Sequence, residues 1–176
     1  MKTDLTRTKI MDILFDYPNR RFHLREISRM IDISAPAVSK SLIRLKKEGL
    51  INYKKNFLVE ITANTNNEFK HLKRVNNLNR IYSSGFQEFL ENEFPLSTVI
   101  LFGSYSFGED TEKSDIDIAI FSEQRIVNIS PFEMKLQRKI NIEFVDIRNI
   151  SDKLRESIIN GIVIHGMLTL DQDARV

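Results

Sequence analysis

The stretch "LFGSYSFGEDTEKSDIDIAIF" (residues 101–121) joins two apolar runs through a polar segment. Gly103 and Ser104 end the first run, and Asp115 and Asp117 stand at alternate positions where the second begins. Side chains of a strand alternate between faces, so we expect both carboxylates on one face, about 7 Å apart at about 3.3 Å per residue. Two such carboxylates repel each other unless a cation lies between them. The stretch therefore predicts two strands that hold Mg²⁺ together with the phosphates of a ligand.

The polar segment between the two runs supplies groups that suit a phosphate. A glycine at a strand end lets backbone N–H groups turn outward, so that Gly103 and the Ser104 hydroxyl can contact phosphate oxygens. Lys113 is the only cation of this segment. The pattern Gly103-Ser104, ten residues, Asp115-Ile116-Asp117 resembles the G-S-x(n)-D-x-D signature of the DNA polymerase β-like nucleotidyltransferase superfamily, and in particular the minimal nucleotidyltransferases. The resemblance extends over some 75 residues, through "INIEFVDI" to "LRESIINGIVIHG".

The resemblance also implies a third carboxylate on the next strand, where relatives carry Asp in a v-D-l-v pattern. In this chain "IEFV" takes that place, which makes Glu143 the counterpart, and strand parity directs Asp146 to the opposite face. Asp115, Asp117 and Glu143 are then the implied catalytic residues and ligands of two Mg²⁺ ions, with ATP or another NTP as substrate. The open alternative is that Glu143 is a solvated residue of an exposed sheet face. Relatives commonly have Arg or Lys where this chain has Phe107.

The first 64 residues form a basic segment with a different pattern. They carry 13 Lys and Arg against 7 Asp and Glu, whereas residues 65–176 carry 13 against 17. Apolar residues recur at helical spacing in three segments, residues 4–17, 22–34 and 35–49. Two strand-like runs follow, residues 50–53 and 57–62, on either side of a Lys-containing turn. Three helices and a hairpin resemble a winged helix-turn-helix domain of the kind found in prokaryotic regulators.

That resemblance implies DNA binding, with the third helix in the major groove and the hairpin as a wing against the phosphates. The implied DNA-binding residues are Ser39, Lys40, Ser41 and Arg44 of the third helix and Lys54 and Lys55 of the wing. The alternative is a winged helix that serves protein contacts only. Its basic residues would then merely keep the surface solvated.

We therefore expect an α+β chain with three parts. Residues 1–64 form the winged helix, residues 65–95 a connector helix that packs on the second domain, and residues 96–176 a minimal nucleotidyltransferase domain. The last part alternates strands with helices, which favours a small α/β domain with a mixed sheet. The chain has no cysteine, its N-terminus lacks an apolar signal segment, and no run approaches the roughly 18 apolar residues that span a membrane. We expect a cytoplasmic protein without a membrane anchor.

Two functions remain open at this point. The first is Mg²⁺-dependent transfer of AMP from ATP to a protein or other hydroxyl acceptor. As in minimal nucleotidyltransferases, this implies an antitoxin-like, autoregulatory protein with a HEPN-type toxin as partner. The second is a DNA-binding transcriptional regulator whose nucleotidyltransferase fold is inactive and serves as a nucleotide sensor or as the platform of a homodimer.

Overall fold

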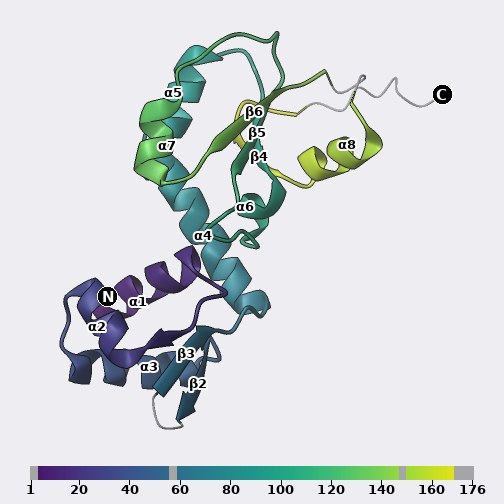
Figure 1. The fold of residues 1–176 in the computed structure, drawn as a ribbon. Coiled ribbons are helices and arrows are strands. Elements are labelled where there is room, and N and C mark those ends of the chain that lie inside the picture. The colour runs from purple at the N-terminus through teal and green to yellow at the C-terminus, as the bar shows by residue number, and fades with distance from the viewer. Residues whose placement is uncertain (1–3, 56–58, 147–149, 169–176) are drawn as a thin grey trace. The chain divides into compact units, whose positions relative to one another are not determined.

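The computed structural model describes residues 4–55, 59–146 and 150–168 (Figure 1). The chain divides into two compact units, Met1–Lys73 and Arg74–Val176, each with its own hydrophobic core. The boundary falls within helix α4 (Asn67–Ser83). Within the described residues, no helix combines the length and the apolar character needed to cross a membrane.

The first unit has the three helices and the hairpin that the sequence predicts. Its elements are α1 (Leu5–Asp16), β1 (Phe22–His23), α2 (Leu24–Ile31), α3 (Ala35–Lys47), β2 (Ile51–Lys55) and β3 (Val59–Ala63). The three strands form an antiparallel sheet in the order β1-β3-β2. Strand β1 was not expected, because two residues carry no periodic signal; it exists because Phe22 pairs with Ile61.

Local signals set the ends of these helices. The Asp4 side chain caps α1 by accepting a hydrogen bond from the Arg7 backbone N–H at 3.3 Å. Asp32 ends α2 in the left-handed conformation, with φ of 53°. Pro36 lies in the first turn of α3, where a missing N–H costs no helical hydrogen bond.

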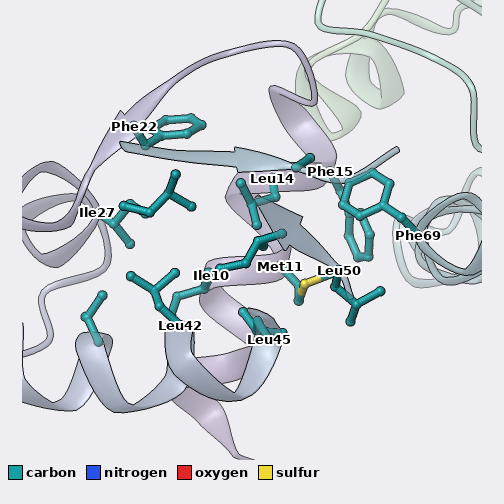
Figure 2. Close-up of a cluster of buried hydrophobic side chains, with 14 of the residues drawn as sticks. Ile10, Met11, Leu14, Phe15, Phe22, Ile27, Leu42, Leu45, Leu50 and Phe69 are labelled. Atoms are coloured by element: carbon teal, nitrogen blue, oxygen red, sulfur yellow. The ribbon is translucent and has the colours of Figure 1, made fainter. Parts of the chain in front are cut away.

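Helices α1, α2 and α3 close over the small sheet around one apolar core. Figure 2 shows ten labelled members of it: Ile10, Met11, Leu14, Phe15, Phe22, Ile27, Leu42, Leu45, Leu50 and Phe69. Phe69 comes from α4, and its ring centroid lies 5.2 Å from that of Phe15. The start of the expected connector helix is therefore part of the core of the first unit.

The expected connector is also divided in two. Helix α4 ends at Ser83, Gly85 adopts φ of 80°, and α5 (Phe86–Glu93) begins after it. The glycine redirects the chain between the two helices, and the apolar face before it is incomplete, because Tyr82 is 47% exposed. Phe86 and Leu90 of α5 are fully buried in the core of the second unit.

The second unit contains a mixed sheet, as the sequence predicts, and this sheet has four strands. After α5 its elements are β4 (Val99–Phe102), α6 (Gly103–Phe107), β5 (Ile116–Ile120), α7 (Ser130–Leu136), β6 (Ile140–Phe144), α8 (Asp152–Ile159) and β7 (Ile162–His165). The strand order is β6-β5-β4-β7, with β5 and β6 parallel and the other pairs antiparallel. Residues 104–107, which we expected in a loop, belong to a helical turn that begins at Gly103, and β7 is an additional strand at the sheet edge.

The two faces of this sheet are covered by different helices (Figure 1). Alternate residues of β5 separate the faces: Ile116, Ile118 and Ile120 pack with α5 and α7, whereas Ala119 packs with Ile158 of α8. Asp117 lies on the Ala119 side by the same alternation. The carboxylates are therefore on the face that α8 covers, near the end of the sheet where β5 begins.

Candidate active site and nucleic-acid interface

The two ends of the GS–DxD signature meet through the pairing of β4 with β5. Phe102 stands opposite Asp117 in the antiparallel register, so Gly103 comes directly beside the carboxylate. A Cβ atom at Gly103 would lie 2.4 Å from Asp117 Oδ2, and Gly103 has φ of +71°. The backbone conformation therefore favours glycine at this position, and a Cβ would in addition force the Asp117 carboxylate to shift.

The two carboxylates are joined by a side chain that sequence reasoning missed. Strand β6 lies parallel to β5 with Asn141 opposite Asp117. The Asn141 Nδ2 group donates hydrogen bonds to Asp115 Oδ2 and to Asp117 Oδ1, both at 3.2 Å. Asp115 precedes the first residue of β5, yet its carboxylate reaches the same amide as that of Asp117. The expectation that both carboxylates share one side of the strand agrees with this geometry.

Glu143 lies on β6, the strand next to β5, and has the same parity as Asn141. It lies opposite Ala119, two residue pairs farther along the strands than Asp117, and it is exposed. Across the three described segments, no group of three His, Cys, Asp or Glu side chains is arranged to hold a metal ion. The alternation of side chains along β6 places both Asn141 and Glu143 on the face of Asp117. The register of β6 against β5 then puts the Asn141 amide beside the carboxylates of Asp115 and Asp117.

The donor set fits one hard cation better than two. Asp115 and Asp117 offer carboxylate oxygens, the ligands that Mg²⁺ prefers, and Mg²⁺ normally completes its octahedron with phosphate oxygens and water. Asn141 contributes an amide, which carries no net charge and in the observed orientation directs N–H groups at the carboxylates. The three-carboxylate arrangement expected for two ions is not assembled among the described residues.

The remaining nucleotide-binding candidates lie on the segment between the strands. Ser104 is the second residue of α6 and is half-buried, while the neighbouring Ser106 hydroxyl donates to the Gly103 carbonyl at 2.8 Å and fixes the turn. Lys113 is exposed in a turn in which the Thr111 N–H donates to Ser114 Oγ at 3.0 Å. Ser104 thus follows Gly103 within a hydrogen-bonded turn, whereas Lys113 is exposed to solvent.

Phe107, which stands where relatives have a cation, is half-buried at the end of α6. It lines a groove of about 350 Å³ together with residues of α8. The other lining residues are Lys153, Glu156, Ser157 and Asn160. Phe107 therefore shares a groove with α8, in which Lys153 and Glu156 carry opposite charges.

A buried polar contact anchors α6 to α4. Asp110 and Asn77 are each 2% exposed, and Asn77 Nδ2 donates to Asp110 Oδ1 at 2.7 Å and to the Tyr105 carbonyl at 2.9 Å. A buried carboxylate is costly without such donors. Sequence spacing gives no signal for this contact, because it joins positions 33 residues apart.

The candidate DNA-binding residues of α3 differ in exposure. Lys40 and Arg44 are exposed, and Ser39 is half-buried. Ser41 is only 3% exposed and its hydroxyl has no hydrogen-bond partner, so it does not reach the outer face of the helix as expected. Its position, three residues after Val38 and one before Leu42, places it at the border of the buried stripe.

Arg44 and the wing lysines complete the candidate interface. Arg44 Nη1 lies 3.2 Å from Asp4 Oδ2 in a solvent-exposed ion pair. Such pairs contribute little stability, so that Arg44 can exchange Asp4 for a phosphate. Lys54 is exposed on β2. Lys55 is the last residue of β2, and its side chain lies outside the described part of the structure.

Comparison with family models finds two matches. Residues 85–170 match the family described as polymerase beta, nucleotidyltransferase, and this range contains β4, β5, β6 and every candidate nucleotide-binding residue. Residues 22–57 match the N-terminal DNA binding domain of the iron dependent repressor family, and this range contains α2, α3 and β2. No curated protein matches the chain.

Proposed function

Because the chain joins a winged-helix DNA-binding domain to a nucleotidyltransferase-fold domain, we propose that it is a DNA-binding regulator that binds an NTP with Mg²⁺. The observation that carries this proposal is the close approach of Gly103 to Asp117. A Cβ atom at Gly103 would lie 2.4 Å from Asp117 Oδ2. The glycine therefore leaves its backbone accessible beside the carboxylate, which suits a phosphate and a cation at that point.

Each residue of this site has a distinct part in nucleotide binding. Asp115 and Asp117 would hold Mg²⁺, which when bound neutralises the phosphate oxygens of the nucleotide. The Ser104 hydroxyl and the backbone of Gly103 would contact the same phosphates. Lys113 or Lys153 would add a positive charge, Lys113 from solvent and Lys153 from the groove beside Phe107.

The side chains of Asn141 and Glu143 on β6 favour nucleotide binding over nucleotidyl transfer. Nucleotidyl transfer requires an acceptor hydroxyl to lose its proton as its oxygen attacks the α-phosphorus and pyrophosphate leaves. Asn141, which lies beside Asp115 and Asp117, has no basic group that could accept this proton. Glu143 has one, but it stands two residue pairs farther along the strands. A regulator that senses ATP or another NTP fits this site best.

A second candidate function is transfer of AMP from ATP to a hydroxyl of a protein. It is favoured by the intact arrangement of Gly103, Asp115 and Asp117, and it needs Glu143 to approach the acceptor and take up its proton. The partner would be a HEPN-type toxin, and the DNA-binding domain would make the protein an antitoxin-like repressor of its own operon. In either function, a homodimer on a palindromic operator fits the winged helix.

Titration calorimetry of the full chain with ATP tests the proposal. Binding should require Mg²⁺ and be lost in EDTA, and Asp115→Asn should weaken it strongly because one ligand charge is removed. Glu112→Gln is the matched control: it removes an exposed carboxylate from the same segment and should bind as the wild type does. Equal ATP affinity in Mg²⁺ and in EDTA would refute the nucleotide site.

Transfer is tested in the same preparations. Incubation with ATP labelled at the α-phosphate, alone and with candidate protein acceptors, should leave the label in free nucleotide if the regulator is correct. Covalent labelling that disappears in Glu143→Gln but persists in Glu112→Gln would instead establish the transferase. DNA binding is measured by fluorescence anisotropy with a mixed-sequence duplex at several salt concentrations, with and without ATP and Mg²⁺.

A further inference from the structure

We propose that Asn141 is a positioning residue that holds Asp115 and Asp117 together while no cation is bound and turns its amide when a cation binds. This inference rests on the proposed nucleotide site. The observation behind it is that one nitrogen, Asn141 Nδ2, donates to both carboxylates at 3.2 Å.

Asp115 and Asp117 repel each other while no cation is bound. Both carboxylates are half-buried, so that water screens their mutual repulsion incompletely. An amide nitrogen carries two hydrogens, and Asn141 gives one to each carboxylate, which makes both hydrogen bonds charge-assisted. Asn141 therefore does in part what a cation would do, and it fixes the separation of the two carboxylates before any ligand arrives.

A cation that contacts both carboxylates would face the partly positive N–H groups of Asn141 in their observed orientation. Rotation of the amide by about half a turn replaces these groups with the carbonyl oxygen, which is a good ligand for a hard cation. The rotation meets little resistance, since Asn141 is exposed and its N–H groups can then bind water.

Only the side chain needs to move. The backbone of Asn141 belongs to β6 and is kept in register with β5, whose Ile116 N–H also donates to the Lys139 carbonyl at 2.8 Å. The strands therefore stay in place while the amide turns. The orientation of one amide would report whether the site holds a cation.

The neighbouring charges do not substitute for Asn141. Lys139 precedes β6 and is exposed, and Glu143 follows on the same face as Asn141 but opposite Ala119. An Asp at position 141 would place a third carboxylate beside Asp115 and Asp117. That change should harm the site without a cation and improve it with one, whereas Ala at the same position should only harm it.

Melting temperatures of the full chain in EDTA and in Mg²⁺, without nucleotide, test these opposite signs. In EDTA, Asn141→Ala should melt about 2–4 °C below the wild type, the shift typical of one lost interaction in a chain of this size, and Asn141→Asp should melt lower still. Mg²⁺ should raise the melting temperature of Asn141→Asp more than that of the wild type. Glu112→Gln, which removes an exposed carboxylate from the segment before β5, should behave as the wild type in both conditions.

The turning of the amide is followed directly by the NMR signals of the Asn141 side-chain NH₂ group, assigned with Asn141→Ala. Titration with Mg²⁺ should shift these two signals before it shifts those of other asparagines. Asn141→Asp that melts like the wild type in EDTA and in Mg²⁺, or NH₂ signals that stay unchanged at saturating Mg²⁺, would overturn the inference. If calorimetry still finds Mg²⁺-dependent ATP binding in that case, the proposed function stands without it.

A different outcome identifies failure of the proposed function itself. The melting temperatures of the variants in EDTA could follow the expected order while neither Mg²⁺ nor ATP binds any of them. In that case Asn141 holds the carboxylates in a domain that does not bind a nucleotide. The turning of the amide is then overturned together with the nucleotide site, and the role of Asn141 in holding the two carboxylates together is retained.

Discussion

Replacing Gly103 with alanine should damage the candidate nucleotide site more than it damages the fold. The added Cβ would lie 2.4 Å from Asp117 Oδ2 and 3.3 Å from its Cγ, so the carboxylate must move. The same carboxylate accepts a hydrogen bond from Asn141, which resists that movement. Alanine at φ of +71° also adopts a backbone conformation that L-residues disfavour.

The expected size follows from these two effects. The left-handed conformation costs about 1–2 kcal/mol for a residue with a Cβ. Displacing Asp117 from Asn141 adds the loss of one hydrogen bond to a charged group, about 1 kcal/mol at this half-exposed site. The free energy of unfolding should therefore fall by about 2–3 kcal/mol, which lowers the melting temperature by about 4–12 °C. Because Asp117 is a proposed Mg²⁺ ligand, ATP affinity should fall at least about tenfold.

Gly85→Ala separates the two effects. Gly85 has φ of +80°, close to that of Gly103, but a Cβ there meets nothing within 4 Å. This variant should lose about 1–2 kcal/mol of stability for the backbone conformation alone and keep its full ATP affinity. Urea denaturation and calorimetry with ATP and Mg²⁺ are measured on both variants. If Gly103→Ala binds ATP as tightly as Gly85→Ala, the close approach of Gly103 to Asp117 does not serve the nucleotide.

Three further changes test other parts of the molecule. Ser41→Ala removes a buried hydroxyl without a hydrogen-bond partner, so the free energy of unfolding should be unchanged or rise by up to about 1 kcal/mol. DNA affinity should not change, and a clear loss of it would show that Ser41 belongs to the DNA interface. Lys54→Ala combined with Lys55→Ala should weaken DNA binding across sequences and reduce the slope of log affinity against log salt by about 1.8, with an unchanged slope contradicting a role of the wing. Asn77→Ala removes a donor to a buried carboxylate and should cost about 1–3 kcal/mol in urea denaturation, whereas Asn79→Ala, exposed on the same helix, should cost almost nothing.

Local spacing in the sequence was sufficient for the features that depend on a few neighbouring residues. The alternation of Asp115 and Asp117 indicates two carboxylates on one side, and both now contact the same amide. The apolar stripes of the first 64 residues predicted three helices and a hairpin, and the family match over residues 22–57 agrees with that domain type. Such features follow from backbone geometry alone, since the period of a helix or strand acts within one element.

Features that depend on the packing of two elements against each other could not be predicted from residue spacing within one element. Parity admits both Asn141 and Glu143 to the correct face of β6, and only the register with β5 decides which of them stands opposite Asp117. Ser41 falls at the border of a helical stripe, where the packing of the first unit decides that it is buried.

The sequence by itself determined that a Gly-Ser turn and two aspartates belong to one candidate site and that a basic helix precedes it. The tertiary structure alone decided that an amide, and not a third carboxylate, completes the contact between the aspartates. The physical reason is that strand register is set by the packing of whole sheets and helices, so that a shift of two residues preserves every local pattern and still exchanges one side chain for another.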